Sequence, residues 1–453
     1  MKGICFALLS FFVFTVYVFA AEAPKYEPNW ESLDKRPTPQ WFTDAKFGIF
    51  IHWGVYSVPA WAPKGEYSEW YWNRLDNEQK SSKGGPSLDF HKKIYGKDFK
   101  YQDFAPMFKA ELFDPDLWAD FFARSGAKYI VLTSKHHDGY CLWPSEQSKG
   151  WNSVGIGPNR DLLGDLTTAV RKRGIKMGFY YSLYEWFNPL YLSDVNRYVT
   201  EYMHPQFKDV VTRYKPSIIF ADGEWDQPSS TWRTPELLAW LFNESPCRDD
   251  VVIDDRWGKD TRSVHGGYYT TEYGQYAQKD MTVVHPWEEC RGMGASFGYS
   301  RRETIDEYRT GEELVKLLVG LVSKGGNLLL DIGPTADGRI PVIMQERLVQ
   351  IGNWLKINGE SIYGTKPFRV TSEGENLFYT SKGDTLYAIC AKWPGNTLIL
   401  NSPKPDANVS VSLIGYDKKI VSSVNNGKLS INLPQLSEVP LSAAYVFRIL
   451  GVK

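Results

Sequence analysis

A carboxylate follows an apolar run near the middle of the chain. Residues 216–221 (Pro-Ser-Ile-Ile-Phe-Ala) are typical of a buried strand, and Asp222 and Gly223 follow at once. A parallel strand covered on both faces accommodates no charge until it leaves the core, so we expect Asp222 where this strand opens into a loop. In α/β barrels, catalysis takes place at that edge. Because Asp-Gly is also ordinary turn chemistry, Asp222 alone leaves a catalytic and a structural interpretation open.

Polar and aromatic residues follow other apolar runs in the same way. If these runs are parallel strands of one barrel, their tails meet at one rim and form a single polar pocket. Each tail alone also has a structural interpretation, since histidines at strand ends are often structural and tyrosines often belong to the core. The tails are His52-Trp53-Gly54, Lys135–Gly139, Tyr180–Ser182, Asp254–Gly258 and Asp331–Pro334.

A metal ion in this pocket is not expected. His136, His137 and Asp138 are residue types that bind zinc or iron. However, neighbouring residues of an extended chain face opposite ways, and the sequence offers no second ligand cluster with suitable spacing. The histidines suit hydrogen bonds to substrate hydroxyl groups better, so we predict neither a metal nor a cofactor.

The elements that would position these tails alternate between strand and helix from about residue 40 to 365. Asp114-Pro115 and Thr234-Pro235 each offer a helix cap followed by proline, and Thr310 and Glu313 form a capping box. The alternation predicts a (β/α)8-like barrel of the TIM type, either regular or distorted and incomplete. Its convincing strands are Phe47–Ile51, Tyr129–Thr133, Lys176–Tyr181, Ser217–Ala221, Val251–Ile253 and Asn327–Leu330.

Beyond about residue 365 the pattern changes to short runs of alternating apolar and polar residues separated by Gly, Asn, Asp and Pro. This pattern predicts a C-terminal antiparallel β-sandwich, so the expected domains are a barrel over residues 24–365 and a sandwich over 366–453. The sandwich contains no catalytic pattern; we expect it to support the barrel, with an ancillary carbohydrate surface as the alternative. Its expected strands are Phe368–Thr371, Leu377–Thr380, Thr385–Ala391, Thr397–Leu400, Val409–Leu413, Lys419–Val421 and Ala443–Leu450.

The first 23 residues differ from the rest of the chain. A positive start at Met1-Lys2, an apolar run over Cys5–Ala20 and small residues up to Ala23 predict a secretory signal peptide rather than a membrane anchor. The mature protein is therefore expected to be soluble. The formal net charge of the 453 residues is −1, with no long basic tract, which argues against a nucleic-acid or membrane partner.

Four cysteines lie beyond this segment: Cys141, Cys247, Cys290 and Cys390. They form no CxxC pair, so a zinc site of the usual spacing is not indicated; disulfides are permitted, but their pairing cannot be read from the sequence. Asn243-Glu-Ser245 and Asn408-Val-Ser410 are potential glycosylation sites in a eukaryotic host. The 17 tryptophans exceed what a core needs and suit a protein that stacks sugar rings.

Nine motifs follow one another in an order that resembles the retaining α-L-fucosidases of glycoside hydrolase family 29. The resemblance covers residues 28 to 365, and the β-rich C-terminal part fits the family's architecture. It implies an exo-acting enzyme that hydrolyses terminal α-L-fucose by double displacement. The alternative is a catalytically inactive, lectin-like relative that only binds fucose. The motifs are GIFIHWG, SEWYWNR, KHHDGY, GFYYS, FADGEW, DDRWG, TTEY, PWEECRGMGASFGY and GNLLLDIGPTADG.

The resemblance also implies the catalytic pair. Asp222 matches the family nucleophile, which would form a covalent fucosyl-enzyme. In a retaining enzyme the acid/base lies about 5–5.5 Å from it. Glu272 is the preferred acid/base and Glu288 the runner-up, whose structural interpretation is a carboxylate that orients a neighbouring His or Arg. Glu224, only two residues from Asp222, does not match the family pattern.

The remaining pocket residues follow from the same resemblance. One set matches positions that hold the sugar hydroxyls or the nucleophile: His52, Glu69, Trp70, His136, His137, Tyr180 and Arg256. Fucose is a 6-deoxy sugar, so Phe297 is expected to receive its methyl group. The chain departs from the family at Phe220, where some relatives have Trp, and at Asp254, where Asn is more usual.

The resemblance implies fucosylated oligosaccharides or glycoconjugates as partners, and family members often form multimers, so a homo-oligomer is also an expectation. With the signal peptide, we expect a secreted or lysosomal glycoprotein, or a periplasmic protein in a bacterium. We expect linkage specificity to depend on the segments Lys80–Tyr95 and Trp186–Asn196.

Overall fold

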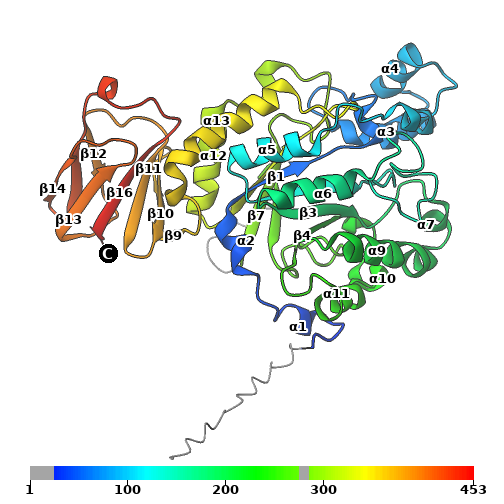
Figure 1. Cartoon of the computed structure of the whole chain (residues 1–453), viewed down its shortest axis with the longest axis horizontal. Helices are drawn as coiled ribbons and strands as arrows, with labels where there is room; N and C mark the ends of the chain where they lie inside the picture. The colour runs from blue at the N-terminus through cyan, green and yellow to red at the C-terminus, as the bar shows by residue number, and fades with distance from the viewer. Residues whose placement is uncertain (1–24, 275–284, 453) are drawn as a thin grey trace, which may run out of the picture.

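Eight parallel strands form one curled sheet in the order β5-β4-β3-β2-β1-β8-β7-β6 (Figure 1). The computed structural model describes residues 25–274 and 285–452, so the predicted signal peptide (residues 1–23) lies outside the described residues. The predicted fold class, a barrel followed by an antiparallel β-domain, is confirmed. The strands are β1 (Phe47–Ile51), β2 (Tyr129–Lys135), β3 (Lys176–Ser182), β4 (Ile218–Asp222), β5 (Val252–Ile253), β6 (Tyr269–Glu272), β7 (Trp287–Gly292) and β8 (Asn327–Ile332).

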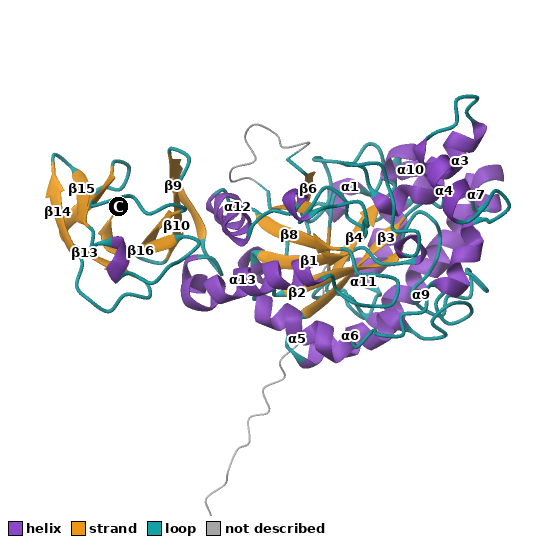
Figure 2. Ribbon diagram, turned by 90° about the horizontal axis from the view of Figure 1, so that it is seen from above, coloured by secondary structure: helices purple, strands orange, loops and turns teal. Residues whose placement is uncertain are grey.

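The barrel is irregular on one side. β5 and β6 stand at the two ends of the strand order, and no ladder joins them in the described part of the chain. Residues 254–268, which connect them, contain no helix, whereas helices surround most of the sheet (Figure 2). The α-helices are α1 (Trp30–Leu33), α2 (Gln40–Ala45), α3 (Tyr71–Lys80), α4 (Pro86–Ile94), α5 (Pro115–Ser125), α6 (Leu162–Lys172), α7 (Pro189–Ser193), α8 (Val195–Arg197), α9 (His204–Tyr214), α10 (Ser229–Trp232), α11 (Thr234–Asn243), α12 (Gly311–Ser323) and α13 (Val342–Asn358).

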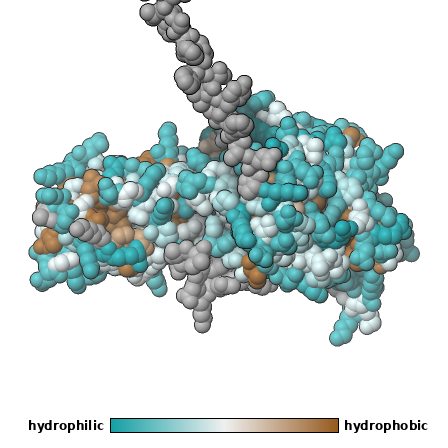
Figure 3. All heavy atoms as spheres, turned by 90° about the horizontal axis from the view of Figure 1, so that it is seen from below, coloured by the Kyte–Doolittle hydropathy of each residue, from teal (hydrophilic) through white to brown (hydrophobic). Residues whose placement is uncertain are grey.

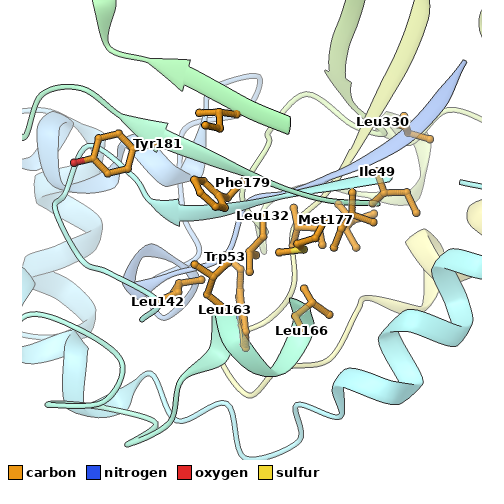
Figure 4. Close-up of a cluster of buried hydrophobic side chains, with 14 of the residues drawn as sticks. Ile49, Trp53, Leu132, Leu142, Leu163, Leu166, Met177, Phe179, Tyr181 and Leu330 are labelled. Carbon is orange, nitrogen blue, oxygen red and sulfur yellow. The ribbon is translucent and has the colours of Figure 1, made fainter. Parts of the chain in front are cut away.

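Side chains alternate between the two faces of the sheet, as the period of an extended chain requires. One set packs outward beneath the helices: Leu132, Met177 and Phe179 meet Leu163 and Leu166 of α6 (Figure 4). The other set fills the barrel interior and includes Phe50, Val131, Tyr180, Phe220 and Leu329. The residue two positions beyond an interior residue also faces inward, which directs the strand tails toward the barrel axis.

The predicted helix starts are observed with one exception. Asp114 caps α5 by accepting a hydrogen bond from Leu117 N, and Thr310 forms the predicted capping box at the start of α12. The prediction for α11 was wrong. Thr234 is its first residue rather than its cap, because the Thr234 hydroxyl donates to Trp257 O at 2.9 Å and so ties the helix to the tail of β5.

The C-terminal domain consists of two antiparallel sheets, ordered β13-β16-β11-β10-β9 and β12-β15-β14, that share one core. The domain lies against α12 and α13 (Figures 1 and 2), where Trp354 Nε1 donates to Ala444 O at 2.9 Å. The sequence did not predict β15, and the predicted strand Lys419–Val421 overlaps β14 only at its first residue. The strands are β9 (Lys366–Glu373), β10 (Leu377–Lys382), β11 (Thr385–Cys390), β12 (Thr397–Leu400), β13 (Pro405–Leu413), β14 (Val421–Asn425), β15 (Lys428–Asn432) and β16 (Tyr445–Val452).

One face of the molecule (Figure 3) is mostly polar over the barrel and more apolar over the C-terminal domain. The face in Figure 3 is mostly hydrophilic, with hydrophobic side chains gathered over the C-terminal domain. None of the described helices combines the length and apolar character that a membrane span would require. The four described cysteines are buried and free of disulfides. Asn408 is exposed, whereas the Asn243 amide is held by the backbone of Tyr26.

Candidate active site

A cavity of about 250 Å³ lies at the carboxyl ends of the barrel strands. Its size is just below the usual range of ligand pockets, about 300–1,000 Å³, so it suits one monosaccharide rather than a chain. Among the residues predicted from sequence, His137 and Glu288 do not line it. The lining residues are Phe50, His52, Tyr67, Glu69, Trp70, His136, Tyr180, Phe220, Asp222, Trp225, Arg256, Arg262, Glu272, Cys290 and Phe297.

Asp222 ends β4 and faces the cavity because it lies two residues beyond the interior Phe220. Its Oδ1 accepts a hydrogen bond from Arg256 Nη1 at 2.9 Å, and its Oδ2 accepts one from the Tyr180 hydroxyl at 2.8 Å. Burial alone would raise the pKa of Asp222, but the Arg256 guanidinium and His137 hold that pKa well below its ordinary value. The carboxylate is thus kept ionised and oriented.

Gly223 permits this placement of Asp222. Its φ is +75°, and a Cβ atom there would lie 2.3 Å from the Tyr184 ring. His137 lies behind Asp222 rather than in the cavity wall. Its Nδ1 is 2.6 Å from Ser182 Oγ, and its Nε2 is 3.4 Å from Asp222 Oδ2. The expectation that adjacent His136 and His137 face opposite ways was too simple, because both rings lie beside the site, 4.2 Å apart.

Arg256 joins Asp222 to a second carboxylate. Its Nη2 lies 3.3 Å from Glu272 Oε2, while its Nη1 bonds Asp222. Glu272 ends β6, and its Oε1 accepts a hydrogen bond from the Tyr67 hydroxyl at 3.1 Å. One guanidinium therefore touches both carboxylates, an arrangement compatible with the separation of about 5–5.5 Å that a retaining glycosidase needs.

Glu288 occupies a different place. It lies inside β7, is fully buried and accepts a hydrogen bond from the Tyr129 hydroxyl. Burial raises the pKa of Glu288 to about 8. Its neighbour Glu289 faces the other way and accepts from the Thr271 hydroxyl and from Gly274 N. Glu288 therefore belongs to the polar part of the barrel interior and does not line the cavity.

Polar groups on the rest of the wall can bind hydroxyl groups. His52 Nδ1 is 2.7 Å from Asp331 Oδ1, which fixes the orientation of the ring. His136 stacks on the Tyr180 ring, and its Nδ1 has no hydrogen-bond partner among the described residues. Glu69 Oε2 accepts from Gly298 N at 2.8 Å, and burial raises the pKa of Glu69 to about 7.

One corner of the cavity is apolar. Phe297 lies 4.9 Å from the His52 ring and 6.3 Å from Phe50, which in turn lies 4.9 Å from Phe220 (ring centroids). The Arg256 guanidinium sits over the Phe220 ring at 4.7 Å. Such a corner accepts a methyl group and repels a hydroxymethyl group, which would lose hydrogen bonds to water.

Asp254 and Glu224, the two further carboxylates near the site, are buried. Asp254 Oδ1 accepts from Ala221 N at 3.2 Å, and burial and Asp255 raise the pKa of Asp254 well above its ordinary value. Glu224 lies 3.5 Å from Arg262 and is absent from the cavity wall.

The sequence did not predict five wall residues: Phe50, Tyr67, Trp225, Arg262 and Cys290. Trp225 is 43% exposed, so it presents a large aromatic ring to solvent at the cavity. Its ring stacks on that of Trp70. Tyr67 directly precedes the SEWYWNR motif and Trp225 is the last residue of FADGEW, so the motifs themselves were the available signal. No group of three or more His, Cys, Asp or Glu in the described residues could hold a metal ion.

Comparisons with known proteins agree with this geometry. A family model described as Alpha-L-fucosidase matches residues 14–360, and one described as Alpha-L-fucosidase C-terminal domain matches residues 371–450. The tissue alpha-L-fucosidase of Bos taurus is 46% identical over 445 residues, covering 95% of this chain and 92% of that protein. The plasma alpha-L-fucosidase of Rattus norvegicus is 44% identical over 433 residues, covering 92% of each. The Thermotoga maritima alpha-fucosidase solved with a mechanism-based inhibitor has a TM-score of 0.80 at 36% identity, covering 94% of this chain and 100% of that one.

Proposed function

The chain belongs to the α-L-fucosidase family, and we propose that Asp222 and Glu272 are the nucleophile and the acid/base of its reaction. It is an exo-acting α-L-fucosidase, a glycoside hydrolase that removes terminal α-L-fucose from glycoconjugates. The observation that carries the residue assignment is Arg256, whose guanidinium contacts both carboxylates at the wall of a cavity sized for one sugar.

The reaction proceeds in two displacements. In the first, an Asp222 oxygen attacks the anomeric carbon while the Glu272 carboxyl gives its proton to the glycosidic oxygen, and the bond to the leaving group breaks. In the second, the Glu272 carboxylate takes a proton from water. The water oxygen then attacks the anomeric carbon, and the bond to Asp222 breaks. The released fucose keeps its α configuration.

The other wall residues bind the sugar. His52, His136 and Glu69 offer donors and acceptors for the ring hydroxyls, and Trp70 offers an apolar ring face. Phe297 and Phe50 surround the 6-methyl group. An inactive fucose-binding protein is the weaker candidate, because both carboxylates and the arginine between them are present.

Replacement of Asp222 tests this proposal. Asp222→Gly is expected to abolish hydrolysis of an aryl α-L-fucoside, because no group remains to attack the anomeric carbon. Added azide should restore turnover by attack from the emptied side and yield a β-fucosyl azide, identifiable by NMR. Asp226→Asn, which changes an exposed carboxylate four residues away, is the control. Near-normal activity of Asp222→Gly without azide would overturn the assignment.

The cellular compartment is proposed from the names of the relatives and from the predicted signal peptide. The names tissue and plasma α-L-fucosidase, together with the predicted signal peptide, support a lysosomal or secreted enzyme. Detection of the processed N-terminus after Ala23 in material from the secretory route tests this assignment.

A further inference from the structure

The open side of the barrel is the side between β5 and β6, where no strand ladder forms in the described residues. A side chain joins the two strands there. In the described part of the chain, the backbone between β5 and the segment that enters β6 contributes two hydrogen bonds, from Gly267 N and Tyr268 N to Ile253 O. Beyond them, Asp255 Oδ1 accepts from Thr270 N at 3.2 Å and from the Thr270 hydroxyl at 2.7 Å. A buried carboxylate on the tail of β5 therefore takes the place of the missing strand ladder and binds β6.

The Thr270 hydroxyl carries this contact into the active site. The Thr270 hydroxyl has one proton, and it donates that proton to Asp255 Oδ1. The Thr270 oxygen is then left to accept from Arg256 Nε, which lies 3.0 Å away. The same guanidinium reaches Asp222 through Nη1 and Glu272 through Nη2. Because its five N–H donors form a rigid planar fork, fixing Nε fixes the direction of the other two nitrogens.

We propose that Asp255 and Thr270 are positioning residues for the fucosidase reaction: through Arg256 they set where the nucleophile and the acid/base stand across the open side of the barrel. Both side chains are buried and neither lines the cavity, so neither touches substrate. The inference rests on the proposed function, because it assigns a purpose to the contacts of Arg256 with Asp222 and Glu272.

A purely structural role would give a different result. Asp255 Oδ2 also accepts from Ser263 N at 2.8 Å, so the carboxylate stabilises the β5–β6 connection as well. Besides the main chain from Asp255 to Arg256, the bond from Arg256 Nε to the Thr270 oxygen links that connection to the catalytic carboxylates. Thr270→Val removes this oxygen while keeping the shape of the side chain, and Thr270→Ser keeps the oxygen. Thr167→Val removes another buried threonine hydroxyl, on α6, and controls for stability.

The expected result is a selective loss in Thr270→Val. Its kcat on an aryl α-L-fucoside should fall up to about 100-fold, the effect of misplacing a reacting group by roughly 1 Å, whereas Thr270→Ser and Thr167→Val stay within about threefold. The acidic limb of the kcat/KM profile should also move to higher pH, because a displaced Arg256 lowers the pKa of Asp222 less. The other charged or titratable groups that face Asp222 are unchanged in these variants: His52, His136, His137, Tyr180, Tyr184 and Glu224.

Two outcomes would overturn the inference. One is Thr270→Val with the wild-type rate and pH profile and only a lower melting temperature; the other is equal losses in Thr270→Val and Thr270→Ser. Asp255→Asn, which keeps the shape of the anchor, must change kcat and the acidic limb in the same direction. Trapping the intermediate with a 2-deoxy-2-fluoro-fucosyl fluoride separates this inference from the proposed function. If a residue other than Asp222 is labelled, the proposed function fails. If Asp222 is labelled and the Thr270 variants behave alike, only the positioning role fails.

Discussion

Glu272 and Glu288, the two candidate acid/base residues, differ in their access to water. The side chain of Glu272 is 23% exposed and lines the cavity, whereas Glu288 is fully buried and bonded to Tyr129. An acid/base must deliver a proton to the leaving group and later take one from water, so it needs contact with both. Glu272 meets this requirement, and Glu288 is better placed to stabilise the polar interior of the barrel.

Alanine substitutions at the two glutamates separate these roles. Glu272→Ala should lose about 10²–10⁴-fold on a natural glycosidic linkage and far less on an activated aryl fucoside, since a good leaving group needs no proton. Glu288→Ala should lower stability while the ratio of the two rates stays near that of the wild type. Steady-state kinetics on both substrates give the answer. A leaving-group dependence confined to Glu288→Ala would reverse the assignment.

At the scale of elements, the sequence predicted the strands that are apolar on both faces and missed β6 and β7. These two strands read YTTE and WEECRG, so neither shows the apolar run of a buried strand. Their polar residues are satisfied by partners distant in sequence: Thr270 by Asp255, and Thr271 by Glu289. A sequence pattern does not report such pairs, and the result was six predicted strands instead of eight.

The same limit applies to the site. Asp222, His52 and Tyr180 could be placed because each belongs to a strand or its immediate tail, whose direction follows from the sheet. Trp225 reaches the cavity from a short 3-10 helix (Glu224–Asp226) and Arg262 from the β5–β6 connection, so their positions depend on the packing of distant segments. The order of the motifs predicted which residue types form the pocket. It did not predict that Arg256 contacts both Asp222 and Glu272.

Helix α13 crosses α5 at Gly352, and that contact tolerates no side chain. A Cβ atom at Gly352 would lie 1.9 Å from the carbonyl oxygen of Arg124. Alanine favours a helix by about 1 kcal/mol over glycine, yet Gly352→Ala should destabilise the protein by about 1–3 kcal/mol, because the helices must separate. Thermal unfolding followed by circular dichroism measures the change.

Gly320, inside α12, is the matched control for this contact. A Cβ atom there would lie 3.5 Å from the Phe378 ring, an ordinary van der Waals distance. Gly320→Ala should therefore leave the melting temperature unchanged or raise it. Equal shifts for Gly320→Ala and Gly352→Ala would show that helix propensity, and not the close approach of α13 to α5, decides the effect.

At the scale of the whole molecule, the barrel holds an unusual number of buried carboxyl groups. Burial raises the pKa of Asp138 to about 6, of Glu69 and Glu224 to about 7, and of Glu288 to about 8. In the unfolded chain these groups titrate near 4. Between about pH 4 and 8 these four groups therefore bind more protons in the folded protein than in the unfolded chain. The linkage relation then gives a contribution to the free energy of unfolding that falls as pH rises.

The melting temperature should accordingly decrease from pH 7 to pH 8 at constant ionic strength. Below about pH 6.5 the buried His52, His136 and His137 act in the opposite sense, because burial lowers their pKa. The stability that these four carboxyl groups contribute is fully present below their pKa in the unfolded chain. It is lost as the pH rises through their pKa in the folded protein. Asp222, whose pKa is depressed, acts in the opposite sense but only at more acidic pH. Glu288→Gln should flatten the curve most between pH 7 and 8, where Glu288 keeps more of its proton than the other three carboxyls. A melting temperature that rises over this window would contradict the buried carboxyls as its cause; a decrease would match an enzyme that works in an acidic compartment.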